Sequence, residues 1–431
     1  MIKRSMCIVL AFVFLFSSTT LVYSKNQDTI DYAYLEYMLL IDELFGDEYF
    51  GVLVEDLQIA HHGEMFMQNY EASHHMLNEF MSNITVQNRM GGVSYPDSFS
   101  GVYFDSDGNL VILTTDYHTD EFFVPAGRTV DTRVVQFSYN TLNELIDILI
   151  DISFSENSTL WDIADSIALD VSGNRIDVRL TEYSQEYIDL FRRTILDSPA
   201  LYFVQSPYSP EIPFDYLEAY LESQTETHED IISTNDAYID ISPASSYVFI
   251  PGRRIGNGSV GYSATCGAGR RGIVTTAHSA AVHTAPNGNI VASVLNPAIH
   301  RCIPTDSAFM TLQNGGTFIP SIPANGPLSN QFAGNPVQGM PVVNVGRTTN
   351  MTSGIITSPL SLWPGRYRAA ESDFVSASGD SGGIVFHSVG SATHHVLGIL
   401  VAIVHRPSGN VSIISRADII NRNLGLRFSN L

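Results

Sequence analysis

The chain has few basic residues and no long apolar run beyond its first two dozen residues, and each shortage excludes a class of protein. It has 22 lysines and arginines against 45 aspartates and glutamates, so the formal net charge is −23. Nucleic-acid binding needs clustered cations, whereas the arginines of the C-terminal half are scattered. A membrane span needs about 20 consecutive apolar residues. We therefore expect neither a nucleic-acid partner nor a membrane partner.

The one long apolar run lies at the N-terminus, where Lys3 and Arg4 precede the eleven apolar residues 6–16. A short polar patch follows and leads to Ser24, a small residue suited to a cleavage site. We predict that residues 1–24 are a secretory signal peptide and that the mature protein is secreted. An uncleaved membrane anchor is the alternative.

Cysteine is scarce as well: the chain has three, and Cys7 falls within the predicted signal peptide. Cys266 and Cys302 remain, and two cysteines in an exported protein can form one disulfide. We expect this bond, with two buried thiols as the alternative. Three pairs of histidines are adjacent in the sequence and so do not share a helix face, and we expect no metal site and no cofactor.

Charge divides the chain into two parts. Residues 241–431 contain twelve arginines, no lysine and five acidic residues, a formal charge of +7, while residues 1–240 carry −30. A change of sign on this scale marks two units with different roles, which could attract each other. The alternative is that the acidic surface only keeps an exported chain soluble. Residues 217–240 are acidic and polar, and we predict an exposed linker that is cut during maturation.

Residues 25–216 have the periodicity of an α+β region. Two β-rich segments, 104–115 and 169–181, each contain an Asp-x-x-Gly-Asn turn, and the two turns lie 65 residues apart. We interpret them as copies of a duplicated unit. Apolar residues recur at helical spacing in 32–46, 64–82 and 141–152.

From residue 241 onward helical spacing nearly disappears. Short β-rich runs alternate with glycine, proline and asparagine, which favours an all-β barrel or sandwich. Residues 415–425 have the pattern of a single terminal helix. We therefore predict that 241–431 is one β-rich domain.

The stretch GDSGG, residues 379–383, places Ser381 between an aspartate and two glycines. A serine hydroxyl becomes a nucleophile only when a base takes its proton and a third group orients the base. The order Ser, acid, His of α/β-hydrolases is excluded, because Asp418 is the only acid after Ser381 and no histidine follows it. The order His, Asp, Ser remains.

The candidates for the base are His278, His283 and His300. His278 ends an apolar run and is followed by small residues, whereas the other two lie in polar or proline-flanked loops. Asp306 directly precedes an apolar run, where a carboxylate can be buried against an imidazole. We predict a catalytic triad of His278, Asp306 and Ser381.

The motifs TTAHS, TDSAFM and GDSGG, in this order, resemble those of chymotrypsin-like (trypsin-fold) serine proteases. The segment VGRTTNMTSGII from Val345 resembles the bacterial streptogrisin and α-lytic subgroup. The resemblance implies two six-stranded antiparallel β-barrels with a C-terminal helix in 241–431. It also implies a serine endopeptidase that acts on protein or peptide substrates through an acyl-enzyme.

The same resemblance implies that residues 25–216 are a propeptide that acts as an intramolecular chaperone and inhibitor of a secreted zymogen. An independent binding domain that stays attached is the alternative for this half. For the whole chain, the alternative is a catalytically silent homologue that serves as a binding or adhesion module.

The resemblance also implies further roles around the triad. The N–H groups of Gly379 and Ser381 would form the oxyanion hole. Arg347 would pair with Asp380 and fix the loop that carries these groups; an exposed turn arginine is the alternative.

The specificity pocket departs from the resemblance. Val375 and Ser376 are at the expected floor of the primary pocket and carry no acid. Val401 takes a place on the substrate-binding strand where a serine is usual. We expect a preference for a small or medium apolar side chain.

Overall fold

The computed structural model describes most of the chain from Leu53 to Phe428. The described residues are 53–87, 93–116, 130–155, 158–206, 248–280, 283–284, 290–293, 301–302, 305–312, 317–322, 325–332, 334–364, 366–388, 394–404 and 410–428. The predicted signal peptide, the predicted helix at 32–46 and the predicted linker at 217–240 lie outside these residues. No helix in the described part of the chain is long and apolar enough to cross a membrane.

Residues 53–206, which we call the N-terminal unit, have the predicted α+β composition. The helices are α4 (Val54–His62), α5 (Glu64–Ile84), α6 (Tyr139–Ser153), α7 (Leu160–Ile163) and α8 (Gln185–Thr194). The strands are β1 (Val86–Gln87), β2 (Val93–Ser94), β3 (Phe99–Phe104), β4 (Leu110–Thr114), β5 (Asp131–Val134), β6 (Ala164–Asp170), β7 (Arg175–Leu180) and β8 (Leu201–Gln205).

The strands of the N-terminal unit form two sets of three with the same pairing. β3 and β4 form an antiparallel hairpin and β5 runs parallel to β4; β6 and β7 form an antiparallel hairpin and β8 runs parallel to β7. The two Asp-x-x-Gly-Asn turns close the hairpins, because Asp105 Oδ1 accepts the Asn109 N–H (2.8 Å) and Asp170 Oδ1 accepts the Gly173 N–H (2.9 Å). The two sets thus share one topology, and the duplicated unit stays a prediction.

Two helices of the N-terminal unit arise from the predicted periodicity. α5 buries Met67, Tyr70, Leu77 and Phe80 at spacings of three, seven and three residues, so one face of the helix enters the core. α6 begins two residues before the predicted range, because the Ser138 hydroxyl accepts the Thr141 N–H and so caps the helix.

Residues 248–428 form the β-rich domain. Its first sheet, which we call the first barrel after the predicted fold although the described strand pairs leave it open, has the order β14-β15-β17-β13-β12-β27 with β16 beside β17. Its strands are β12 (Ser263–Cys266), β13 (Arg271–Thr276), β14 (His283–Thr284), β15 (Ile290–Ser293), β16 (Arg301–Cys302), β17 (Ser307–Leu312) and β27 (Leu426–Phe428).

Six antiparallel strands close into a second barrel. Each pairs with two others in the ring β21-β22-β23-β26-β25-β24 and back to β21. They are β21 (Pro341–Gly346), β22 (Asn350–Trp363), β23 (Arg366–Ser372), β24 (Ile384–Ser388), β25 (His394–Val404) and β26 (Val411–Arg416). The trypsin-like fold class implied by the motifs is confirmed.

The remaining elements connect or flank the barrels. They are β9 (Val248–Phe249), β10 (Arg254–Ile255), β11 (Gly258–Ser259), β18 (Thr317–Phe318), β19 (Ser321–Ile322), β20 (Gly326–Phe332) and α11 (Ala417–Leu424). The predicted terminal helix is α11, which ends at Gly425 in the left-handed conformation that glycine adopts readily.

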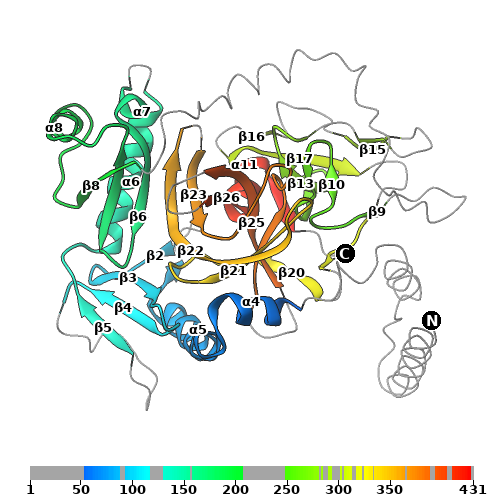
Figure 1. The fold of residues 1–431 in the computed structure, drawn as a ribbon, viewed down its shortest axis with the longest axis horizontal. Coiled ribbons are helices and arrows are strands. Elements are labelled where there is room, and N and C mark those ends of the chain that lie inside the picture. Colours follow the sequence, from blue (N-terminus) through cyan, green and yellow to red (C-terminus); the bar gives the residue numbers. More distant parts are fainter. Residues whose placement is uncertain are drawn as a thin grey trace, which may run out of the picture. The chain divides into compact units, whose positions relative to one another are not determined.

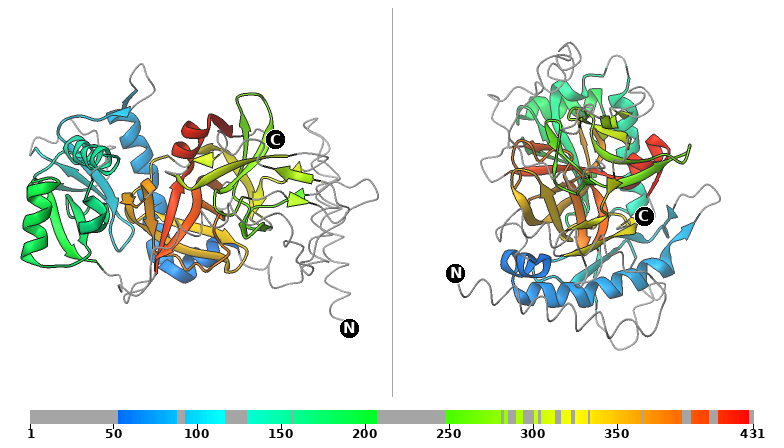
Figure 2. Two further views of the ribbon diagram at one scale, coloured as in Figure 1. Left: turned by 90° about the horizontal axis from the view of Figure 1, so that it is seen from above. Right: turned by 90° about the vertical axis from the view of Figure 1, so that its right-hand side faces the viewer.

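The N-terminal unit packs on the second barrel. β6 pairs with β22 (Ala168 with Ser361, Ile167 with Leu362), so that β6, β7 and β8, together with β19 and β20, extend the barrel into one eleven-stranded sheet. One apolar core includes side chains of α5 and of the second barrel. In Figure 1 and in the left view of Figure 2, strands β3 to β8 of the N-terminal unit and the strands of the first barrel lie on opposite sides of the second barrel, while α4 runs beneath the second barrel in Figure 1.

The predicted disulfide between Cys266 and Cys302 is not formed. Cys266 is a buried free thiol that lies at the Arg271 end of β13. Cys302 pairs with Ser307, which lies opposite Thr276 at the other end of β13. At about 3.4 Å per residue this offset is roughly 17 Å along the strand, whereas bridged Cα atoms lie within about 7 Å. The side chain of Cys302 lies outside the described residues.

Candidate active site

The first barrel brings His278 and Asp306 together. His278 follows β13 and Asp306 precedes β17, and these two strands are antiparallel neighbours. His278 Nδ1 lies 2.8 Å from Asp306 Oδ2, and the His278 main-chain N–H donates to Asp306 Oδ1 at 3.3 Å. A proton on Nδ1 leaves Nε2 as the acceptor, which is the state that a general base requires.

The backbone around Asp306 fixes this pair. Asp306 has a φ of 44°, in the left-handed region that aspartate tolerates better than most residues. Its carbonyl accepts the Ala277 N–H at 3.1 Å, so the residue before the histidine is tied to the aspartate as well. Two further contacts thus hold the carboxylate beside the imidazole.

The loop that carries Ser381 lies against the loop that carries His278. A Cβ atom added to Gly258 would lie 2.4 Å from Ser381 O and 2.6 Å from Ser279 Oγ, so only glycine permits this approach. The Ser259 N–H also donates to Ser381 O at 2.7 Å. Ser381 Oγ makes no hydrogen bond to any described residue. Catalytic hydrogen bonds are often long in ligand-free enzymes and tighten only when substrate binds.

Two N–H groups of the Ser381 loop are unpaired. Asp380 N–H donates to Ala377 O (3.1 Å), Gly382 N–H to Leu400 O (2.7 Å) and Gly383 N–H to Asp380 O (2.8 Å). The N–H groups of Gly379 and Ser381, which alternate with these donors, bind no group of the described protein. Unpaired main-chain donors beside a serine are what the stabilisation of an oxyanion requires.

The predicted ion pair between Arg347 and Asp380 is not formed. The buried carboxylate of Asp380 accepts four hydrogen bonds: from the N–H groups of Thr348 (2.7 Å), Thr349 (3.1 Å) and Ala377 (2.9 Å), and from Thr349 Oγ1 (2.7 Å). These bonds satisfy the buried charge without a cation. The Arg347 guanidinium instead lies against Gly379, where an added Cβ would be 2.5 Å from its Nε.

The predicted pocket residues lie in three different environments. Val375 is 60% exposed, whereas Ser376 is buried and its hydroxyl lies 2.7 Å from that of Ser412 on β26. Val401 is fully buried in the core that joins the two barrels. Ser412 is a residue that sequence reasoning missed, because it lies 36 positions from its partner.

The acids near this segment bind elsewhere. Asp373 Oδ1 accepts the Ile355 N–H at 2.7 Å, and Glu371 forms a two-bond ion pair with Arg179 of the N-terminal unit (2.7 and 2.9 Å). Glu371 is therefore already paired, and Asp373 is exposed with one oxygen bound to the main chain of β22.

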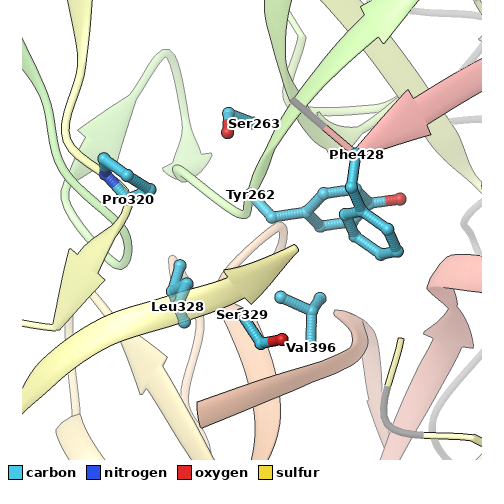
Figure 3. Close-up of a pocket in the computed structure, with 7 residues that line it drawn as sticks. All are labelled: Tyr262, Ser263, Pro320, Leu328, Ser329, Val396 and Phe428. Atoms are coloured by element: carbon cyan, nitrogen blue, oxygen red, sulfur yellow. The ribbon is translucent and has the colours of Figure 1, made fainter. Parts of the chain in front are cut away.

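A small pocket between the barrels is not part of the site. It is lined by Tyr262, Leu328, Val396 and Phe428, among others, and has a volume of about 10 Å³ (Figure 3). A space of this size holds at most one water molecule. Among the described residues, no cluster of three or more histidine, cysteine or acidic side chains has the geometry to hold a metal ion.

Comparisons with known proteins give two results. Residues 140–206 match a family model described as a Pro-like C-terminal domain. Searches of solved structures find Thermobifida fusca protease A (18% identity, TM-score 0.32, covering 42% of this chain and 97% of that one). They also find Nocardiopsis protease (21% identity, TM-score 0.33, covering 42% of this chain and 98% of that one). A third match is Cellulomonas bogoriensis chymotrypsin (19% identity, TM-score 0.34, covering 43% of this chain and 100% of that one).

The chain resembles bacterial chymotrypsin-like serine proteases. The fold itself rests on the strand pairing described above, since the structural scores are low. No curated protein matches the chain. The matched segment 140–206 comprises α6 to β8, the part of the N-terminal unit whose strand pairs with the second barrel.

Proposed function

We propose that the chain is a secreted serine endopeptidase that is made as a zymogen. The observation that carries the proposal is the 2.8 Å contact between His278 Nδ1 and Asp306 Oδ2, formed beside a serine loop with two unpaired N–H groups. In a catalytic triad a carboxylate orients the imidazole that acts as the base. Amino-acid composition alone does not bring these two side chains together.

The proposed reaction is acyl transfer to Ser381. Ser381 Oγ attacks the peptide carbonyl carbon while His278 Nε2 takes its proton, and Asp306 stabilises the imidazolium that forms. The N–H groups of Gly379 and Ser381 bind the oxyanion. His278 then protonates the leaving amine, and water hydrolyses the acyl-enzyme by the same steps. The uncharged pair Ser376–Ser412 favours an uncharged side chain at the primary pocket.

The N-terminal unit is proposed to be the propeptide. Its β6 completes hydrogen bonds of β22, and its apolar side chains are buried with those of the second barrel. Antiparallel barrels depend on contacts distant in sequence and fold slowly, so a preformed sheet edge that pairs with β22 would assist folding. Maturation would then require a cut between the two parts of the chain.

The proposal is tested by labelling with a serine-directed fluorophosphonate. The wild-type full chain, Ser381→Ala and Ser279→Ala are expressed for secretion and analysed by labelling and intact mass. Ser279 is a matched control, because it adjoins His278 and its buried hydroxyl has no hydrogen-bond partner among the described residues.

We expect the wild type and Ser279→Ala to label and to separate into two fragments, and Ser381→Ala to do neither. Folded wild type that neither labels nor cleaves itself would overturn the proposal in favour of a silent binding module.

A further inference from the structure

The unpaired N–H of Gly379 belongs to a peptide group whose carbonyl is held by another residue. In the Ser378–Gly379 peptide the C=O and N–H point in opposite directions, because the group is planar and trans. Thr348 Oγ1 donates to Ser378 O at 2.8 Å. Whatever fixes the Ser378 carbonyl therefore fixes the direction of the Gly379 N–H.

The same turn also holds the next residue of the loop. Thr349 binds the Asp380 carboxylate through both its N–H and its hydroxyl, and Thr348 adds its N–H. Ser259 Oγ donates to Gly379 O at 2.8 Å and accepts the Arg347 N–H at 3.0 Å. The turn between β21 and β22 thus holds the loop on both sides of Gly379.

Gly379 itself cannot hold this geometry without help. Its φ of 97° is available to glycine at little cost, so the peptide that precedes it can rotate more freely than any other in the loop. A rotated Ser378–Gly379 peptide would direct a carbonyl oxygen, not an N–H, toward the oxyanion. A hydroxyl donor placed on the Ser378 carbonyl opposes that rotation.

We infer that Thr348 is a positioning residue of the oxyanion hole, which holds the Ser378 carbonyl so that the Gly379 N–H is directed at the reacting carbonyl. Thr349 anchors the neighbouring Asp380 in support. The inference rests on the proposed function, since it assigns Thr348 a role in that same site. Positioning by two threonine hydroxyls takes the place of the guanidinium that the resemblance implied.

The test compares valine substitutions, which keep the shape of threonine and remove the hydroxyl. Thr348→Val is the main variant, Thr348→Ser restores the donor, and Thr357→Val is the control. Thr357 lies on β22 and its hydroxyl has no hydrogen-bond partner among the described residues. All are expressed as the full chain, and kcat and KM are measured on the self-processed product with a peptide anilide.

We expect Thr348→Val to lower kcat about 10-fold or more, up to the 10²–10³ that loss of one oxyanion donor costs, with KM changed less than twofold. A peptide aldehyde should bind more weakly by the same factor as kcat/KM falls. Thr348→Ser should recover most of kcat, and Thr357→Val should match the wild type.

Failure of the positioning role and failure of the proposed function are distinguishable. Equal kinetics for Thr348→Val and Thr357→Val would overturn the positioning role while leaving the protease intact. An inactive, unlabelled wild type would overturn the proposed function, and the positioning role with it. A rise in KM with kcat unchanged would assign Thr348 to substrate binding and also contradict the inference.

Discussion

The two barrels contribute different parts of the site and have different neighbours. The first barrel holds the His278–Asp306 pair, and among the described residues of the N-terminal unit only α4 contributes side chains to a core that includes first-barrel strands. The second barrel carries Ser381 and its loop, and it shares a sheet and a core with that unit. The base is therefore built locally, whereas the barrel that carries the nucleophile is built against the segment proposed to be removed.

The difference teaches that chemistry and assembly can be disrupted separately. A change in the first barrel at the His278–Asp306 pair should remove activity and leave the contact with the N-terminal unit intact. A change at that contact should destabilise the full chain and leave the triad geometry intact.

The largest effect is expected for Asp306→Asn. The amide keeps the shape of the carboxylate but favours the wrong imidazole tautomer and cannot stabilise the imidazolium, so kcat should fall about 10⁴-fold. Urea unfolding of the full chain should change little, since the sheet and the core that the N-terminal unit shares with the second barrel do not include this pair. A loss of kcat below tenfold, measured with a peptide anilide, would contradict the assigned role.

The second-largest effect is expected for Arg179→Met, on the free energy of unfolding. The variant is made in full-chain Ser381→Ala to prevent self-cleavage. Glu371 is 1% exposed and would lose the two-bond partner it has on the N-terminal unit. Removing one member of a buried pair costs about 3–5 kcal/mol, which urea unfolding would detect.

The control for this variant is Arg192→Met. Arg192 lies 3.7 Å from Asp197, and both side chains are largely exposed. Exposed pairs contribute about 0–1 kcal/mol. Equal losses of unfolding free energy in the two variants would show that the buried contact does not hold the units together.

Acid should weaken the contact between the N-terminal unit and the second barrel. Burial, together with neighbouring histidines, lowers the pKa of His387 on β24 well below 6.5, and lowers the pKa of His74 on α5 to about 4. The groups that face His387 are Tyr70, whose hydroxyl is hydrogen-bonded to it, His74 and His395. Lowered values mean that the unfolded chain binds protons more readily than the folded chain below pH 6.5.

The stability from these neutral histidines is therefore complete above pH 6.5 and decreases as the pH falls toward 4. We expect the urea midpoint of full-chain Ser381→Ala to fall over this range, and His74→Gln to reduce the fall. His75→Gln, which removes an exposed neighbour that adds a smaller part of the shift in the His74 pKa than burial does, should reduce the fall less than His74→Gln. A midpoint that stays constant from pH 6.5 to 4.5 would exclude this effect.

The sequence predicted those features that depend on neighbours in the chain. The helix α5 and both hairpin turns followed from apolar spacing and from Asp-x-x-Gly-Asn. His278 and Asp306 each lie at the end of a β-rich run, and the pairing of β13 with β17 brings such ends together. Each of these predictions used a pattern of residues within a single helix, strand or turn.

Features that depend on competition between distant groups were not predictable in this way. Arg347 was expected to neutralise Asp380, but the threonines beside it reach the carboxylate with shorter groups. The net charges of the two halves also did not predict which residues pair. Among the described residues, the best-buried ion pair between the halves joins an arginine of the acidic half to Glu371 of the basic half. Cys266 and Cys302 are far apart because β13 and β17 separate their strands.

Native-state hydrogen exchange of full-chain Ser381→Ala in rising urea tests most directly whether the N-terminal unit and the second barrel form one cooperative unit. The account predicts that the amides of β6 and β7 lose protection in the same opening as those of β21 and β22, while β13 and β17 open with a different free energy. Exchange of β6 and β7 at a clearly lower free energy, with β22 still protected, would contradict it.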